Sequence, residues 1–131
     1  MKKIYEPQTK EAIDQIISVF SDYIKTCSYF DLLWSEKVGY IFISVDIKHR
    51  TAGDWDTWVV ESAEELLDKI LYEFAADILE DGGHAVAPCE ASKIERAEIE
   101  RQLRPYLEKL HDYPDCLQRV FKEGNALRGL C

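Results

Sequence analysis

Apolar residues recur at helical spacing near the start of the chain. From Ala12 to Cys27 they return every three or four positions, and Thr9 stands where the cap of such a helix is needed. The pattern predicts one amphipathic helix that begins after Thr9, ends near Ser28 and rests one side on a core. The members of its apolar side are Ala12, Ile13, Ile16, Ile17, Val19, Phe20, Tyr23, Ile24 and Cys27.

A strict alternation follows the first helix. Two alternating runs, over residues 30–34 and 38–47, flank a short polar link and predict an antiparallel hairpin. A second turn leads to a third predicted strand over residues 55–60. One face of this sheet is aliphatic, and we expect it to pack on the helices. The aliphatic residues are Ile41, Ile43, Val45 and Ile47.

The remaining chain has helical spacing. Ser62 with Glu65, and Ser92 with Glu95, have the spacing of capping boxes and predict two helix starts. Pro105 is expected to kink or break the second of these helices.

Pro114 predicts the first turn of a last short helix, which Gly124 ends. The predicted order is α-β-β-β-α-α-α. This is an α+β fold with a three-stranded antiparallel sheet, an N-terminal helix and a C-terminal helical group. We expect a single domain over residues 1–123 and a tail over residues 124–131.

The charge balance limits the partners of this chain. It carries 16 Lys and Arg against 25 Asp and Glu, a net charge of −9 over 131 residues. The element order matches that of double-stranded RNA-binding domains, but residues 61–81 carry eight acids against Lys69 alone. Because phosphate would be repelled, we expect neither nucleic acid nor a membrane surface as partner. A basic protein fits this charge better.

The four cysteines are scattered and form no metal-binding or redox motif. With no export signal and no apolar run long enough to span a bilayer, we expect a soluble, cytoplasmic protein with reduced thiols. Cys27 and Cys116 fall on apolar stripes and are predicted to be small core residues. Cys131 is predicted to be an exposed tail thiol.

Charged residues on two apolar stripes call for an explanation. Asp77 falls beside Phe74, and Arg96 falls in the stripe of the next helix, so we expect a structural ion pair between Asp77 and Arg96. The alternative is that Glu73 and Asp77, with His84, hold a divalent cation or act as acid and base. We expect no cofactor and no catalytic residue.

The aromatic residues of the sheet are candidates for binding. The face opposite the aliphatic one is predicted to carry Phe30, Trp34, Tyr40 and Phe42, and the C-terminal helices are expected to cover it. Trp55 and Trp58 project in opposite directions if the third strand is regular. If this face is open, it forms a dimer or partner interface, or an aromatic pocket for a small ligand. The candidates are Trp34, Tyr40, Phe42, Trp55 and Trp58.

Three segments carry a resemblance to known sequences. Residues 30–46, the segment from Tyr72 to Asp77, and the segment from Glu95 to Glu98 resemble a small family of uncharacterised bacterial proteins. The resemblance implies a bacterial origin, and because no activity is assigned to that family it implies no site residue.

Three functions fit this sequence. The first is a non-catalytic protein-interaction module, regulatory or immunity-like, that binds a basic target through the acidic residues Glu64, Glu65 and Asp68. The second is a small metal-binding protein or enzyme that uses the helix carboxylates. The third is a small-ligand binder with an aromatic pocket.

Overall fold

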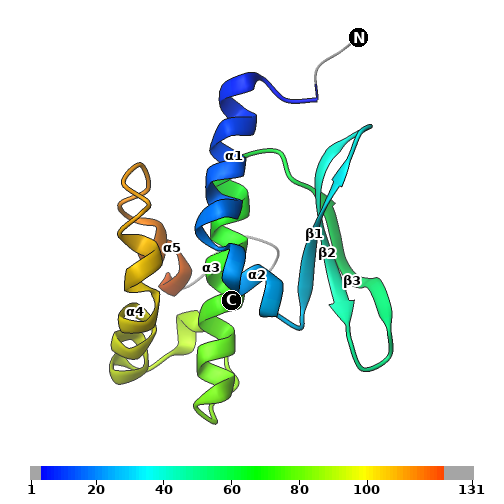
Figure 1. Cartoon of the computed structure of the whole chain (residues 1–131). Helices are drawn as coiled ribbons and strands as arrows, with labels where there is room; N and C mark the ends of the chain where they lie inside the picture. Colours follow the sequence, from blue (N-terminus) through cyan, green and yellow to red (C-terminus); the bar gives the residue numbers. More distant parts are fainter. Residues whose placement is uncertain (1–3, 123–131) are drawn as a thin grey trace. The chain divides into compact units, whose positions relative to one another are not determined.

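The computed structural model describes residues 4–122, and the predicted tail, with Gly124 and Cys131, lies outside them. The chain divides into two compact units, residues 1–66 and residues 67–131. This division does not test the prediction of a single domain over residues 1–123, which stays a prediction. Among the described residues the fold is α+β, as predicted, with helices on either side of the strands in the sequence (Figure 1).

The predicted first helix is two helices. α1 (Pro7–Val19) begins with Glu6 at its N-cap and Pro7 in its first turn, so Thr9 is not the cap. The backbone of Phe20 leaves the helical conformation and separates α1 from α2 (Ser21–Thr26). Ile13, Ile16 and Phe20 are fully buried, which confirms the predicted core side of this segment.

Three strands form one antiparallel sheet in the order β1-β2-β3. Their bounds are Phe30–Ser35, Gly39–Asp46 and Thr51–Val59. Each row of paired residues points to one face of the sheet, because side chains alternate along a strand. Leu33 pairs with Ile41 and Ile41 with Val59, whereas Leu32 pairs with Phe42 and Phe42 with Trp58.

The buried face of the sheet is the aromatic one. Phe42 is 1% exposed, and its ring stacks on Phe30 at 4.6 Å and on Trp58 at 5.1 Å between centroids. Within the first unit, α1 and α2 lie on this side of the sheet (Figure 1). The expectation that the aliphatic face packs on the helices is therefore wrong: Ile41, Ile43 and Val45 are only half-buried, and Ile47 is exposed.

A bulge in β3 follows from a buried hydroxyl group. Ser44 is 1% exposed, and its Oγ accepts hydrogen bonds from the backbone nitrogens of Trp55 (3.3 Å) and Asp56 (3.2 Å). The register between β2 and β3 shifts at this point, so several β3 residues stand opposite Ser44. Such a bulge redirects side chains, and here it places Trp55 on the surface.

α3 (Ala63–Asp81) crosses from the first unit into the second, which also holds a short 3₁₀ turn (η1, Pro88–Glu90), α4 (Lys93–Leu107) and α5 (Cys116–Phe121). The predicted capping box of Ser92 and Glu95 is present at the start of α4. Pro105 lies within the last turn of α4 and does not break it. None of the helices among residues 4–122 has the length and apolar character that a bilayer span requires.

The cysteines differ in state. Cys27 is a half-buried free thiol and Cys116 a buried one, where burial raises the thiol pKa. Cys89 is disulfide-bonded, so the expectation of reduced thiols is wrong at this position. That expectation came from the lack of an export signal, which carries no information on the pairing of sulfur atoms.

Gly39, the first residue of β2, packs closely against Tyr5 in the segment before α1. Its φ is 95°, and a Cβ at this position would lie 2.6 Å from the Tyr5 hydroxyl oxygen. That hydroxyl is fixed, because it donates to the Val60 carbonyl at 2.6 Å and accepts from the Tyr40 nitrogen at 3.0 Å. The side chain of Tyr5 therefore cannot move aside without losing two hydrogen bonds.

We expect Gly39→Ala to lower the free energy of unfolding by about 1–3 kcal/mol more than Gly83→Ala does. Gly83 also has a positive φ, 86°, but a Cβ there would meet nothing within 4 Å, so it reports backbone strain alone. Urea denaturation of the two variants measures the difference. Equal losses would contradict the close packing of Tyr5 on Gly39.

Candidate functional site

The aliphatic face of the sheet lies uncovered by the described helices of the first unit (Figure 1). We call it the open face. It contains the apolar row Leu33, Ile41 and Val59, and next to it the row Asp31, Ile43 and Thr57. None of its side chains is buried, and Leu33 (44%) and Ile47 (64%) are the most exposed aliphatic ones. Its residues are Tyr29, Asp31, Leu33, Ile41, Ile43, Val45, Ile47, Thr57 and Val59.

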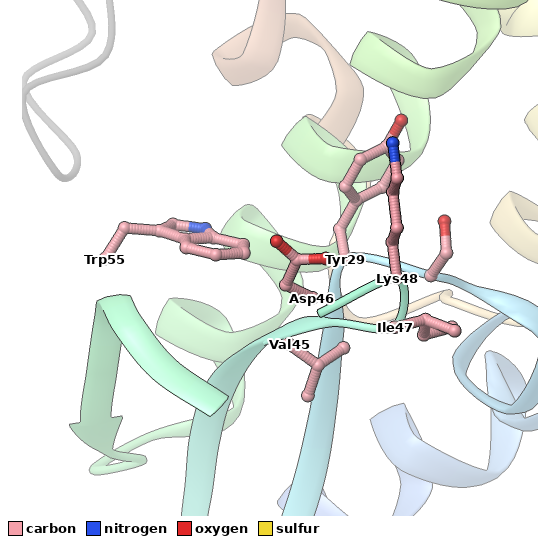
Figure 2. A pocket seen from close by; sticks show the side chains of 7 residues that line it. Tyr29, Val45, Asp46, Ile47, Lys48 and Trp55 are labelled. Atoms are coloured by element: carbon pink, nitrogen blue, oxygen red, sulfur yellow. The ribbon is translucent and has the colours of Figure 1, made fainter. Parts of the chain in front are cut away.

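A hollow of about 520 Å³ lies at the end of the open face where β2 turns toward β3. Figure 2 shows Trp55 on one side of it and Tyr29 on the other, with the Asp46 carboxylate pointing toward the Trp55 ring. Both rings are exposed, Trp55 by 58% and Tyr29 by 39%. The complete lining is Ser28, Tyr29, Val45, Asp46, Ile47, Lys48 and Trp55.

The turn beside the hollow is held by Asp46. Its two carboxylate oxygens bind the backbone nitrogen of His49 at 3.1 Å and the His49 Nδ1 at 2.8 Å. These bonds keep the pKa of Asp46 below its usual range, so the carboxylate is ionised at neutral pH. Arg50 completes the turn with a φ of 55°, a left-handed conformation. Trp55 reaches the same place because of the bulge at Ser44.

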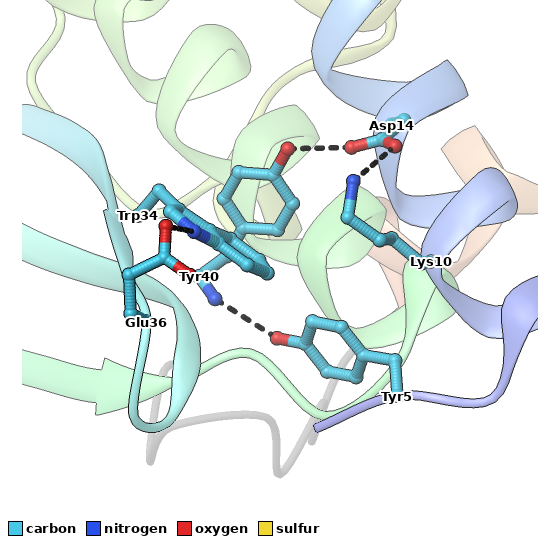
Figure 3. A network of polar contacts seen from close by, with 6 residues as sticks. All are labelled: Tyr5, Lys10, Asp14, Trp34, Glu36 and Tyr40. Carbon is cyan, nitrogen blue, oxygen red and sulfur yellow. Dashed lines mark hydrogen bonds and ion pairs between the residues drawn. The ribbon is translucent and has the colours of Figure 1, made fainter. Parts of the chain in front are cut away.

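Tyr40 and Trp34 belong to a different group, at the opposite end of β1 and β2. The Tyr40 hydroxyl donates to Asp14 at 2.5 Å, and Lys10 binds Asp14 at 2.8 Å (Figure 3). The Lys10 amine also lies 5.2 Å from the Trp34 ring centroid. These bonds connect α1 to the sheet. We therefore assign Tyr40 and Trp34 a role in structure.

The five aromatic candidates thus separate into three environments. Phe42 and Trp58 are stacked within the buried face, and Trp34 and Tyr40 contact α1. Trp55 alone among them lines the hollow. Tyr29, which the sequence did not single out, completes it. The sequence contains one indication of this role: Tyr29 alternates in phase with Asp31 and Leu33, so it belongs to the same face as Val45. The Val45 backbone nitrogen donates to the Tyr29 carbonyl at 2.8 Å.

The proposed metal residues have other partners. The Glu73 carboxylate lies 3.1 Å from the buried Lys69 amine, and His84 Nδ1 lies 2.7 Å from Glu95. No group of three or more His, Cys, Asp or Glu side chains within residues 4–122 is arranged to hold a metal ion.

Arg96 donates to the backbone carbonyls of Ala91 at 3.1 Å and Cys89 at 2.9 Å, and its guanidinium lies over Phe121. Its ion pair with Asp77 stays a prediction.

The acidic side of α3 is partly neutralised. Asp68 Oδ1 accepts hydrogen bonds from Arg119 at 3.0 and 2.7 Å. Glu64 is exposed, whereas Glu65 is half-buried. Because Asp68 is already paired with Arg119, this surface offers a basic partner less attraction than the sequence predicted.

Comparison of the chain with protein-family models, with curated proteins and with solved structures gave no match. The resemblance to a bacterial family stays a prediction. The geometry of the open face and its hollow is therefore the basis on which a function is assigned.

Tyr40 gives the network around α1 a pH dependence. Burial, followed by the hydrogen bond to the Asp14 carboxylate, raises the pKa of Tyr40 to about 12. Its contribution to stability is therefore complete below the pKa of about 10 of an unfolded tyrosine and is lost as pH rises through 12.

We expect Tyr40→Phe to lower the free energy of unfolding by about 1 kcal/mol at neutral pH. This difference from wild type should shrink between about pH 10 and pH 12, because ionisation removes the same bond from the wild type. Urea denaturation across this range measures it. A difference that stays constant with pH would contradict the role given to the Tyr40–Asp14 bond.

Proposed function

We propose that this chain is a non-catalytic protein-interaction module that binds a basic partner protein through the open face. The observation that carries the proposal is the row Leu33, Ile41 and Val59 on the uncovered side of the sheet. A continuous apolar surface that faces water is unfavourable unless something covers it, and such surfaces are typical of protein interfaces.

Charge favours a partner other than a second copy. Two chains that each carry −9 repel each other, whereas a basic protein is attracted at long range. Asp31 lies on the edge strand β1, next to the apolar row, and Glu36 and Asp54 are exposed in the neighbouring turn and in β3. A partner that presents apolar residues with Lys or Arg between them complements this arrangement.

A small-ligand binder is the second candidate, and the hollow with Trp55 and Tyr29 favours it. A volume of about 520 Å³ is enough for a metabolite. The hollow is continuous with the open face, however, through Val45 and Ile47. We therefore regard it as part of one protein-binding surface.

The test compares two variants in a quantitative capture from native lysate. Leu33→Ser combined with Ile47→Ser removes two exposed aliphatic side chains of the open face. Ile94→Ser removes one that is 84% exposed on α4 and serves as the control. We expect a basic protein to co-purify with wild type and control, and to fall about tenfold or more with the double variant.

Purified partner and protein should then give the same order of affinities in a binding titration, with melting temperatures confirming that both variants fold. Equal retention by all three proteins would contradict the proposal. If the wild type self-associates and the double variant does not, the partner of the open face is a second copy of this chain and not a basic protein.

A further inference from the structure

The hollow at the end of the open face combines two kinds of group that recognise a cation. Trp55 and Tyr29 present exposed aromatic rings from two different strand regions. Between them lies the Asp46 carboxylate, which Figure 2 shows pointing toward Trp55. An aromatic face attracts a cation through its quadrupole, and a neighbouring carboxylate adds a direct ionic contact.

We propose that the hollow is the anchor site for an arginine side chain of the partner protein. A guanidinium is planar, so it stacks on an indole ring while its N–H groups point at a carboxylate. The inference rests on the proposed function, because it names the residue that a basic partner inserts. It also agrees with the properties of binding hot spots, where arginine and tryptophan are enriched.

Asp46 retains the capacity to bind this arginine. The two carboxylate oxygens have four lone pairs together, and the bonds from His49 and from the backbone of Lys48 use at most three of them. The side chain of Asp46 is 32% exposed, so its free lone pairs are accessible from solvent. The turn also fixes the carboxylate in place, which lowers the entropy lost when the guanidinium binds.

Lys48 opposes the arginine and thereby supplies a test. Its amine lies on the Tyr29 side of the hollow, away from the Trp55 ring (Figure 2). A like charge at the rim weakens the binding of a cation and strengthens the binding of an anion. Removing the Lys48 charge should therefore raise the affinity of the hollow for a cation and lower its affinity for an anion.

The experiment uses two acetylated and amidated peptides of alternating valine and arginine or valine and citrulline. Citrulline keeps the shape of arginine and removes its charge. Binding is followed by the backbone amide chemical shift of Asp46, a residue that lines the hollow and is unchanged in every variant. We expect the arginine peptide to bind about tenfold more tightly than the citrulline peptide, and Trp55→Ala to remove most of that preference.

Lys48→Gln should tighten the arginine peptide severalfold at low salt, whereas Trp34→Ala, outside the hollow, should leave its affinity unchanged. Equal binding of the two peptides, or weaker binding by Lys48→Gln, would overturn the arginine assignment. If the open-face double variant nevertheless loses its partner, the interaction module stands and only the anchor residue is wrong. If the arginine preference holds while that variant keeps its partner, the hollow binds cations independently of the open face.

Discussion

The stack of Phe30, Phe42 and Trp58 decides how the first unit is arranged. Phe30 and Phe42 are almost fully buried, and the stacking of three large rings adds to the stabilisation that their burial provides. Because neighbouring side chains on a strand point in opposite directions, burying these rings turns Asp31, Leu33, Ile41, Ile43 and Val45 to the other face. The open face is therefore a consequence of the aromatic core.

Polar contacts then fix the rings in place. Asp14 of α1 binds the Tyr40 hydroxyl, and Tyr5 joins the backbones of Tyr40 and Val60 at the end of the sheet. Ser44 satisfies two backbone nitrogens where the register shifts, and the resulting bulge carries Trp55 to the surface. The burial of the aromatic face thus also buries Ser44, and the hydrogen bonds of Ser44 position Trp55 at the hollow.

Much of the secondary structure could be predicted from the sequence, since local spacing determines it. The alternation over residues 30–47 and the capping box of Ser92 were sufficient for their elements. The choice of face could not be predicted in the same way, because both faces are apolar. Contacts between distant residues, such as Asp14 with Tyr40, decide it. The hollow was missed for the same reason, since Trp55 reaches it only through the register shift between β2 and β3.

The site and its proposed partner both depend on the aliphatic face of the sheet, and not the aromatic one, being exposed to solvent. NMR with a soluble paramagnetic agent on methyl- and phenylalanine-labelled protein tests this exposure directly. The methyl groups of Ile41, Ile43, Val45 and Val59 should relax strongly, while the ring protons of Phe30 and Phe42 should stay protected. Protected methyl groups together with relaxed rings would contradict the account.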